Sequence, residues 1–306
     1  MNRRGFLRAV GLAGAAGLLT ACGGGAGAGS DPTTDGGSST KAQADDIIVA
    51  VAPDAAQTLS VVDASFEQLT GTGQPFAFGL VGQDNQPVRN ADVRVHVLPT
   101  GSEITGPYAA EFRDVPRVAL GLYVVRIDLT EAVPTAIVIV TADGAQAGLT
   151  GVNVVTPADS ALPAPGDHAI VTPTPTRADP MGLRNLCTRE PDCGMHDVSL
   201  AQALADRRPV MLTFATPAYC ETAVCGPSVD VLEQVRTARN WGDVAFVHVE
   251  IFSDAGKSVA RPVHKWGLPS EPWLFAIAGD GTITDRADGP LLILPDQVAA
   301  MASQLA

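Results

Sequence analysis

Short apolar runs separated by turn residues dominate residues 47–156. In the segments Val93-Arg-Val-His-Val97 and Val125-Arg-Ile127, apolar and polar side chains alternate, as expected of strands with one buried face. No helical periodicity intervenes. The pattern predicts an antiparallel β-sandwich of about seven strands. The predicted strands cover residues 47–51, 76–81, 93–98, 108–112, 122–129, 136–141 and 149–155.

The pattern changes in residues 182–306. The uniformly apolar run 210–214 predicts a buried strand, and the spacing of Val229, Leu232 and Val235 after it predicts a helix. Further elements are predicted as follows: a short helix at 200–205, a second buried strand at 244–251, a hairpin of 272–277 and 282–286, and a last helix at 295–305. This β-α-β, then β-β-α order predicts a C-terminal α/β domain, so the chain as a whole is multidomain.

Two segments have the composition of connectors. Residues 22–46 are rich in glycine and serine and predict a flexible tether. Residues 157–181 contain six prolines and predict a semi-rigid, extended linker. We therefore expect the β-sandwich at 47–156 and the α/β domain at 182–306 to fold independently.

The N-terminus has the features of an export signal. Arg3 and Arg4 precede an apolar stretch at 9–19 that is too short to span a bilayer. The arginine pair resembles a twin-arginine (Tat) signal, and Leu19-Thr20-Ala21-Cys22 resembles a bacterial lipobox. These resemblances imply a signal peptide at 1–21, lipidation of Cys22, and a lipid anchor on the extracytoplasmic face of the cell membrane.

Charge excludes one class of partner. The chain has 20 basic and 33 acidic residues, and removal of residues 1–21 would take away Arg3, Arg4 and Arg8 but no acidic residue. A strongly acidic protein is repelled by the phosphates of nucleic acids and anionic lipids. We expect no nucleic-acid partner, and we expect attachment to the membrane through acyl chains alone.

Cysteine provides the candidate chemistry. Four of the five cysteines remain once Cys22 is set aside, and in an exported protein an even number favours disulfides. Of the three connectivities, we predict the two local pairs, Cys187–Cys193 as a structural disulfide and Cys220–Cys225 as a redox pair. Residues five apart on one regular helix point about 140° apart, so Cys220 should lie in the loop before the helix. There the helix N-terminus could stabilise a thiolate.

The second pair and its surroundings resemble the thioredoxin superfamily. The resemblance covers roughly residues 195–306: a cysteine motif between strand and helix, Pro227 and Asp230 in that helix, and the stretch from Trp266 to Phe275. It implies a cis-proline at Pro272 facing the cysteines. Four residues separate the cysteines where the family has two, and Thr213 replaces the family's buried strand acid.

Roles follow for the candidate site residues. Cys220, nearer the loop, would be the attacking thiolate, and Cys225 would resolve the mixed disulfide. The resemblance implies that the Glu271 backbone aligns a substrate chain. Tyr219 and Trp273 could form an apolar platform, with Trp273 as a core residue as the alternative. No nucleotide, flavin or phosphate motif is present, so no cofactor is predicted.

Three functions remain open. The first is a thiol-disulfide oxidoreductase that acts on envelope protein thiols or disulfides. The second is a non-catalytic envelope protein with two structural disulfides. The third is copper handling of the Sco type, in which His196 or His264 would approach the cysteine pair, because thiolate and imidazole suit Cu(I); no metal ligand is otherwise predicted. The Gly121–Ile127 run loosely resembles Ig-like accessory domains of envelope proteins, and it implies spacing or partner binding for the sandwich.

Overall fold

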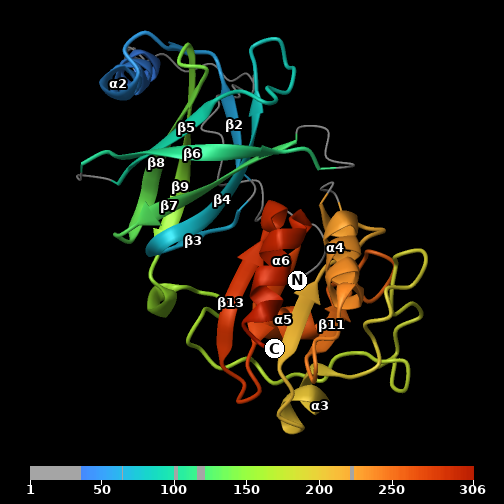
Figure 1. Cartoon of the computed structure of the whole chain (residues 1–306). Coiled ribbons are helices and arrows are strands. Elements are labelled where there is room, and N and C mark those ends of the chain that lie inside the picture. Colours follow the sequence, from blue (N-terminus) through green and yellow to red (C-terminus); the bar gives the residue numbers. More distant parts are fainter. Residues whose placement is uncertain (1–35, 64, 100–102, 116–120, 221–223) are drawn as a thin grey trace, which may run out of the picture.

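The computed structural model describes residues 36–306 except 64, 100–102, 116–120 and 221–223; for 36–43 it describes the backbone alone. The predicted signal peptide, Cys22 and residues 22–35 of the tether lie outside the described residues. Within the described part, no helix has the length and apolarity needed to cross a membrane. The chain forms two domains, a larger β-rich domain and a smaller C-terminal α/β domain (Figure 1).

The β-rich domain is one nine-stranded arrangement that closes around a common core. Strand β6 pairs with β5 on one side and with β7 on the other, so it joins the two halves of the sheet. The order is β1-β9-β8-β5-β6-β7-β4-β2, with β3 also paired to β9. The bounds are β1 Ala56–Gln57, β2 Ser60–Asp63, β3 Gln68–Leu69, β4 Gly71–Val81, β5 Val93–Leu98, β6 Thr105–Arg113, β7 Leu122–Leu129, β8 Val133–Ala142 and β9 Gln146–Val155.

Six of the seven predicted β-rich runs fall within the six longest strands of this domain. In β5, Val93, Val95 and Val97 are buried in the core while Arg94 is exposed, which is the period of two expected of a half-buried strand. The short strands β1, β2 and β3 were missed, because two to four residues are too few to show a period. Both β1 and β3 pair in parallel with β9, so the domain is not purely antiparallel.

One predicted strand is wrong. Residues 47–51 are the last turns of helix α2, Gly36–Val51, so residues 36–46 of the expected flexible tether are helical too. Ile48 packs on Ile139 and Ala147 of the sheet, with Ile47 and Val51 against the same cluster. A short apolar run is compatible with either a strand or a buried helix face, and here packing selects the helix. In Figure 1, α2 lies at the end of the β-rich domain farthest from the α/β domain.

The C-terminal domain follows the predicted order. Its four-stranded sheet has the order β11-β10-β12-β13, with β10 and β11 parallel and the other pairs antiparallel. The bounds are α3 Leu200–Ala205, β10 Val210–Phe214, α4 Cys225–Ala238, β11 Ala245–Val249, α5 Arg261–Trp266, β12 Trp273–Ile277, β13 Ile283–Asp288 and α6 Pro295–Ser303, with short 3₁₀ turns η1 Pro157–Asp159 and η2 Gly289–Ile293.

Each face of this sheet has its own core. On β10, Leu212 and Phe214 face the cluster that contains α3 and α5, whereas Met211 faces the cluster that contains α4 and α6. Figure 1 shows α4 and α6 side by side on one face of the sheet. Because side chains alternate along a strand, the next residues on the α4 face are Thr213 of β10 and His248 of β11. Both are fully buried polar side chains.

The proline-rich segment is bound to the second domain. The Ala169 N–H donates to Gly281 O, and Gly166 and Asp167 exchange backbone hydrogen bonds with Ile283 of β13. Leu162 and Ala169 are buried in the α5 face core. The segment contains the 3₁₀ turn η1 and further turns, and it packs along the α/β domain.

The two domains also touch directly. Arg286 of β13 forms a salt bridge with Glu67 of the β-rich domain at 2.5 Å, and both side chains are only 4 % exposed. Arg286 also donates to Ser160 Oγ, and the Phe66 N–H donates to the Asp288 carboxylate. Removing one partner of such a buried pair strongly destabilises the folded protein, because the other charge stays buried without compensation. A buried polar interface therefore joins the two domains, and the sequence analysis did not predict it.

Candidate functional site

A disulfide joins the loop after β10 to the start of α4. Cys220 and Cys225 are bonded, with their Cα atoms 6.1 Å apart. Cys225 is the first residue of α4 and Cys220 lies in the preceding loop, as the spacing predicted. Cys225 is completely buried, whereas Cys220 is half-buried. Cys220 is therefore the more exposed residue of the pair.

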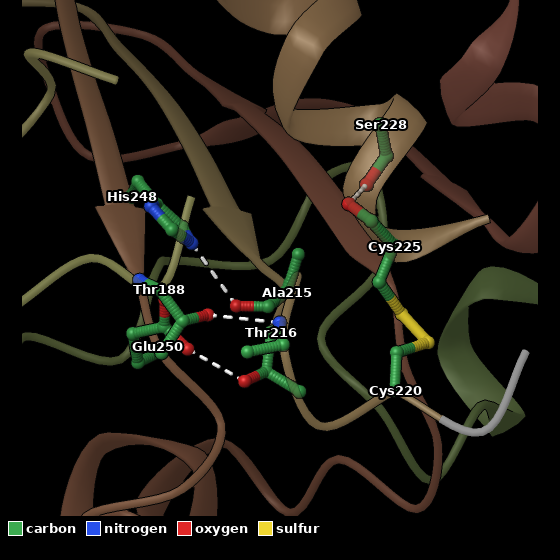
Figure 2. The surroundings of a disulfide bond; sticks show 9 residues. Thr188, Ala215, Thr216, Cys220, Cys225, Ser228, His248 and Glu250 are labelled. Atoms are coloured by element: carbon green, nitrogen blue, oxygen red, sulfur yellow. Dashed lines mark hydrogen bonds between the residues drawn. A yellow bond between two sulfur atoms is a disulfide. The ribbon is translucent and has the colours of Figure 1, made fainter. Parts of the chain in front are cut away.

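The helix start provides a favourable environment for a thiolate. The N-terminus of the fourteen-residue helix α4 carries a partial positive charge close to Cys225. The Ser228 hydroxyl donates to Cys225 O at 2.8 Å and holds this turn in place (Figure 2). If the disulfide opened, Cys225 would be released at the positive end of a helix dipole.

Glu271 lies next to the disulfide, and Pro272 follows it in the chain. The Glu271–Pro272 peptide is cis, as the resemblance implied. Glu271 is buried, and one of its carboxylate oxygens lies within 4.8 Å of the sulfurs of both Cys220 and Cys225. Sequence analysis assigned only the Glu271 backbone to the site, so the position of the carboxylate is new.

The predicted aromatic platform is wrong in part. Trp273 is 1 % exposed, stacks on Phe275 and donates from Nε1 to Ser270 Oγ, so it is the core residue of the alternative prediction and cannot contact a substrate. Tyr219 is half-buried against the α5 face core. Thr213, at the position of the family's strand acid, donates its hydroxyl to Trp273 O at 3.0 Å and is not a proton acceptor for the cysteines.

The predicted disulfide between Cys187 and Cys193 is absent from the structure. Both are buried free thiols. The physical reason is the neighbourhood of the sulfurs. Cys193 Sγ lies 3.4 Å from His196 Nε2 and 3.4 Å from His248 Nδ1, and Cys187 Sγ lies 3.8 Å from the same His248 nitrogen. Each sulfur thus has a histidine partner. His196 belongs to this cluster, and the described groups around Cys220 and Cys225 contain neither His196 nor the exposed His264.

Sequence reasoning missed His248. A signal was present, because His248 is a single histidine inside the otherwise apolar strand β11, Ala245–Val249. A buried polar side chain in such a strand needs partners on the face to which it points. Those partners come from a loop 55 residues earlier in the chain.

The cluster favours a thiolate. The hydrogen bond from Cys193, together with His196 and His248, lowers the pKa of the Cys187 thiol although burial opposes the shift. The same contact and burial raise the pKa of Cys193. Burial lowers the pKa of His248, but the contact to Cys187, the charge of Glu250 and the Ala215 carbonyl outweigh burial and raise it.

A hydrogen-bond network connects this cluster with the loop that carries Cys220 (Figure 2). His248 Nε2 donates to Ala215 O at 3.0 Å. The buried Glu250 carboxylate accepts from the Thr188 N–H and from the Thr216 hydroxyl, both at 2.6 Å. Thr188 Oγ1 in turn accepts from the Ala218 N–H at 3.0 Å. The residues next to Cys187 therefore hold the backbone that leads to Cys220.

Comparison with known proteins adds little to this description. No protein-family model matches the chain, and no curated protein matches it. Among solved structures, the filamin domain of Lin-41 is similar over 33 % of this chain and 96 % of that domain, with 13 % sequence identity and a TM-score of 0.22. At that score the likeness supports no conclusion about this chain.

Proposed function

We propose that the protein is a thiol-disulfide oxidoreductase whose redox centre is the Cys220–Cys225 pair. The observation that carries the proposal is the arrangement of the pair: one half-buried sulfur in a loop, one buried sulfur at a helix start, and a carboxylate within 4.8 Å of both. The β-α-β-β-α order and the sheet order support a thioredoxin-like fold for this domain, and the strand arrangement supports an Ig-like sandwich for the first.

The reaction would be a two-electron exchange. A substrate thiolate attacks Cys220 Sγ, a mixed disulfide forms, the Cys220–Cys225 bond breaks, and Cys225 leaves as a thiolate at the α4 N-terminus. A second substrate thiolate then attacks the substrate sulfur of the mixed disulfide and releases Cys220. The substrate dithiol is oxidised to a disulfide, and the pair is reduced to two thiols; the reverse sequence reduces a substrate disulfide.

Glu271 would act as general acid and general base in this exchange. Thr213 cannot accept a proton from Cys225, but the Glu271 carboxylate lies near both sulfurs. It would protonate the departing Cys225 thiolate and, in the reverse direction, deprotonate Cys225 for attack on the mixed disulfide. The buried acid of the family would thus be replaced from the neighbouring cis-proline segment.

The N-terminal sequence supports a proposal for the location. We propose a signal peptide at 1–21 of the twin-arginine type, a lipid anchor on Cys22, and a site on the extracytoplasmic face of the cell membrane. Protein thiols or disulfides of the envelope would be the substrates. The acidic charge is unsuited to nucleic acids.

Redox titration in a thiol buffer tests the proposal. We expect the Cys220–Cys225 pair to be reduced at a midpoint above about −300 mV, the range that separates redox-active from structural disulfides. Resistance to reduction across that range would instead indicate the non-catalytic envelope protein. Stoichiometric binding of Cu(I) by the reduced pair, lost in Cys220→Ser, would favour copper handling of the Sco type.

The role of Glu271 is tested separately. Glu271→Gln keeps the size of the side chain and removes its ability to accept a proton. The rate of thiol-disulfide exchange should fall by about 100-fold. The part of its pH dependence that reports the titration of Glu271 should be absent in the variant. Glu190→Gln is the matched control, since Glu190 also precedes a cis-proline but is exposed. Equal rates for the two variants would exclude Glu271 as the proton acceptor.

A further inference from the structure

A second cysteine site lies in the α/β domain, apart from the redox pair. Cys187 and Cys193 come from the loop before α3, His196 from the next turn of that loop, and His248 from β11. One ligand atom of each residue lies within 4.8 Å of every other, and the four side chains are at most 4 % exposed. Two thiols and two imidazoles thus converge on one point inside the protein.

The distances match a tetrahedral metal site. With Zn–S bonds of about 2.3 Å and Zn–N bonds of about 2.0 Å, sulfur and nitrogen ligands are about 3.5 Å apart. Here three of the four sulfur-to-nitrogen distances are 3.4, 3.4 and 3.8 Å, and the fourth, between Cys187 and His196, is within 4.8 Å. Ligand atoms already at this separation need little movement to enclose an ion.

The surroundings orient the ligands. The Ala215 carbonyl accepts a hydrogen bond from His248 Nε2, and this directs the Nδ1 lone pair towards both sulfurs. Metal-bound histidines almost always donate their other ring nitrogen in this way. The loop is also held at the backbone: Arg236 donates to Cys193 O, the His248 N–H donates to Met195 O, and the Arg177 N–H donates to His196 O.

We propose that Cys187, Cys193, His196 and His248 form a structural Zn²⁺ site that fastens the loop before α3 to the sheet. Two thiolates and two imidazoles in tetrahedral arrangement are the typical donor set for zinc. All four positions are filled by protein and the ligands are buried, which is the closed geometry of structural and not catalytic zinc. The site does not depend on redox activity of the other pair.

Metal content gives the first test. The chain, purified without chelators, should contain about one zinc per molecule by plasma mass spectrometry. Cys193→Ser and His196→Asn should reduce the zinc content at least tenfold. Cys220→Ser and His264→Asn, the matched changes outside the cluster, should retain it. Zinc content that does not differ between the two sets of variants overturns the proposal.

Alkylation gives the second test and needs no variant. Unfolding in a chelator without reductant should expose Cys187 and Cys193 to alkylation while Cys220 and Cys225 stay protected by their disulfide. Replacement of zinc by Co²⁺ should produce the visible absorption of tetrahedral thiolate coordination. A Cys187–Cys193 disulfide in peptide maps, free thiols without bound metal, or copper in place of zinc would each overturn the proposal.

Discussion

The two cysteine pairs of the α/β domain are similar in sequence and different in structure. Cys220 and Cys225 are five positions apart and bonded, with Cys220 half-buried in a loop and Cys225 buried at the start of a helix. Cys187 and Cys193 are six positions apart, fully buried, and not bonded. The difference lies in the neighbours. A carboxylate lies beside the first pair, whereas two imidazole nitrogens approach the second. Spacing brings two sulfurs into range, and the side chains around them select the chemistry.

The largest expected effect concerns the second pair. If zinc fastens the loop to β11, a strong chelator should lower the free energy of unfolding by about 4 kcal/mol, for free zinc initially about 1,000-fold above its dissociation constant. The measurement is thermal unfolding followed by near-ultraviolet circular dichroism, with and without chelator. The Cys193→Ser variant should be insensitive to the chelator. Equal chelator responses of Cys193→Ser and the unmodified protein would contradict the comparison.

The next prediction concerns the pH dependence of stability and Asp288, which lies near the segment that contains Glu271. Asp288 pairs with Trp273 across the β12–β13 ladder, next to Pro272. Burial raises the pKa of Asp288 to about 7, although the Phe66 N–H opposes the shift. The folded chain therefore holds a proton that the unfolded chain releases near pH 4, so the unfolding free energy should fall by up to about 4 kcal/mol as pH rises from about 4 to about 7.

Asp288→Asn isolates this contribution. The variant should lack the decrease, so its stability relative to the unmodified protein should rise between pH 5 and pH 8, as measured by thermal unfolding at both values. Zinc content at the two pH values serves as a control for the other site and should not change with the substitution. Parallel pH profiles of the two proteins would exclude Asp288 as the source.

Opening the first pair should have a smaller effect on stability. A disulfide that closes a loop of about six residues stabilises by about 2 kcal/mol in the chain-entropy description. Cys220→Ser should lose that amount together with exchange activity and retain its zinc. Cys225→Ser should instead accumulate a mixed disulfide on Cys220, detectable by intact mass. If Cys220→Ser forms the adduct and Cys225→Ser does not, the two roles are reversed.

The smallest effect tests a contact between the two sites. Arg189 of the Cys187 loop bridges Asp230 and Glu233 of α4 at 2.6 Å each, with 17 % of its side chain exposed. Arg189→Ala should cost about 1 kcal/mol, the upper end for such pairs. Arg94→Ala, which breaks an exposed pair with Asp92 in the β-rich domain, is the control and should change the unfolding midpoint little. Equal effects would mean that the bridge does not hold the loop.

The local pattern of apolar and polar residues predicted much of the fold. Alternation located β5 and β7 to the residue, because a half-buried strand must place every second side chain in the core. It failed at residues 47–51, where a short apolar run is compatible with two backbone conformations and only packing on Ile139 and Ala147 selects the helix. It failed again at the proline-rich segment, whose composition indicates stiffness but not the surface on which the segment lies.

For the candidate site, the sequence by itself determined what depends on neighbours along the chain: Cys220 in a loop, Cys225 at a helix start, and Pro272 ahead of β12. Only the tertiary structure decided what meets across the sheet. His248 reaches Cys193 over 55 positions, and the Glu271 carboxylate reaches a disulfide formed some fifty residues earlier. Backbone conformation depends on local sterics and on the period of apolar side chains. The partners of a sulfur depend on strand order and register, which long-range packing sets.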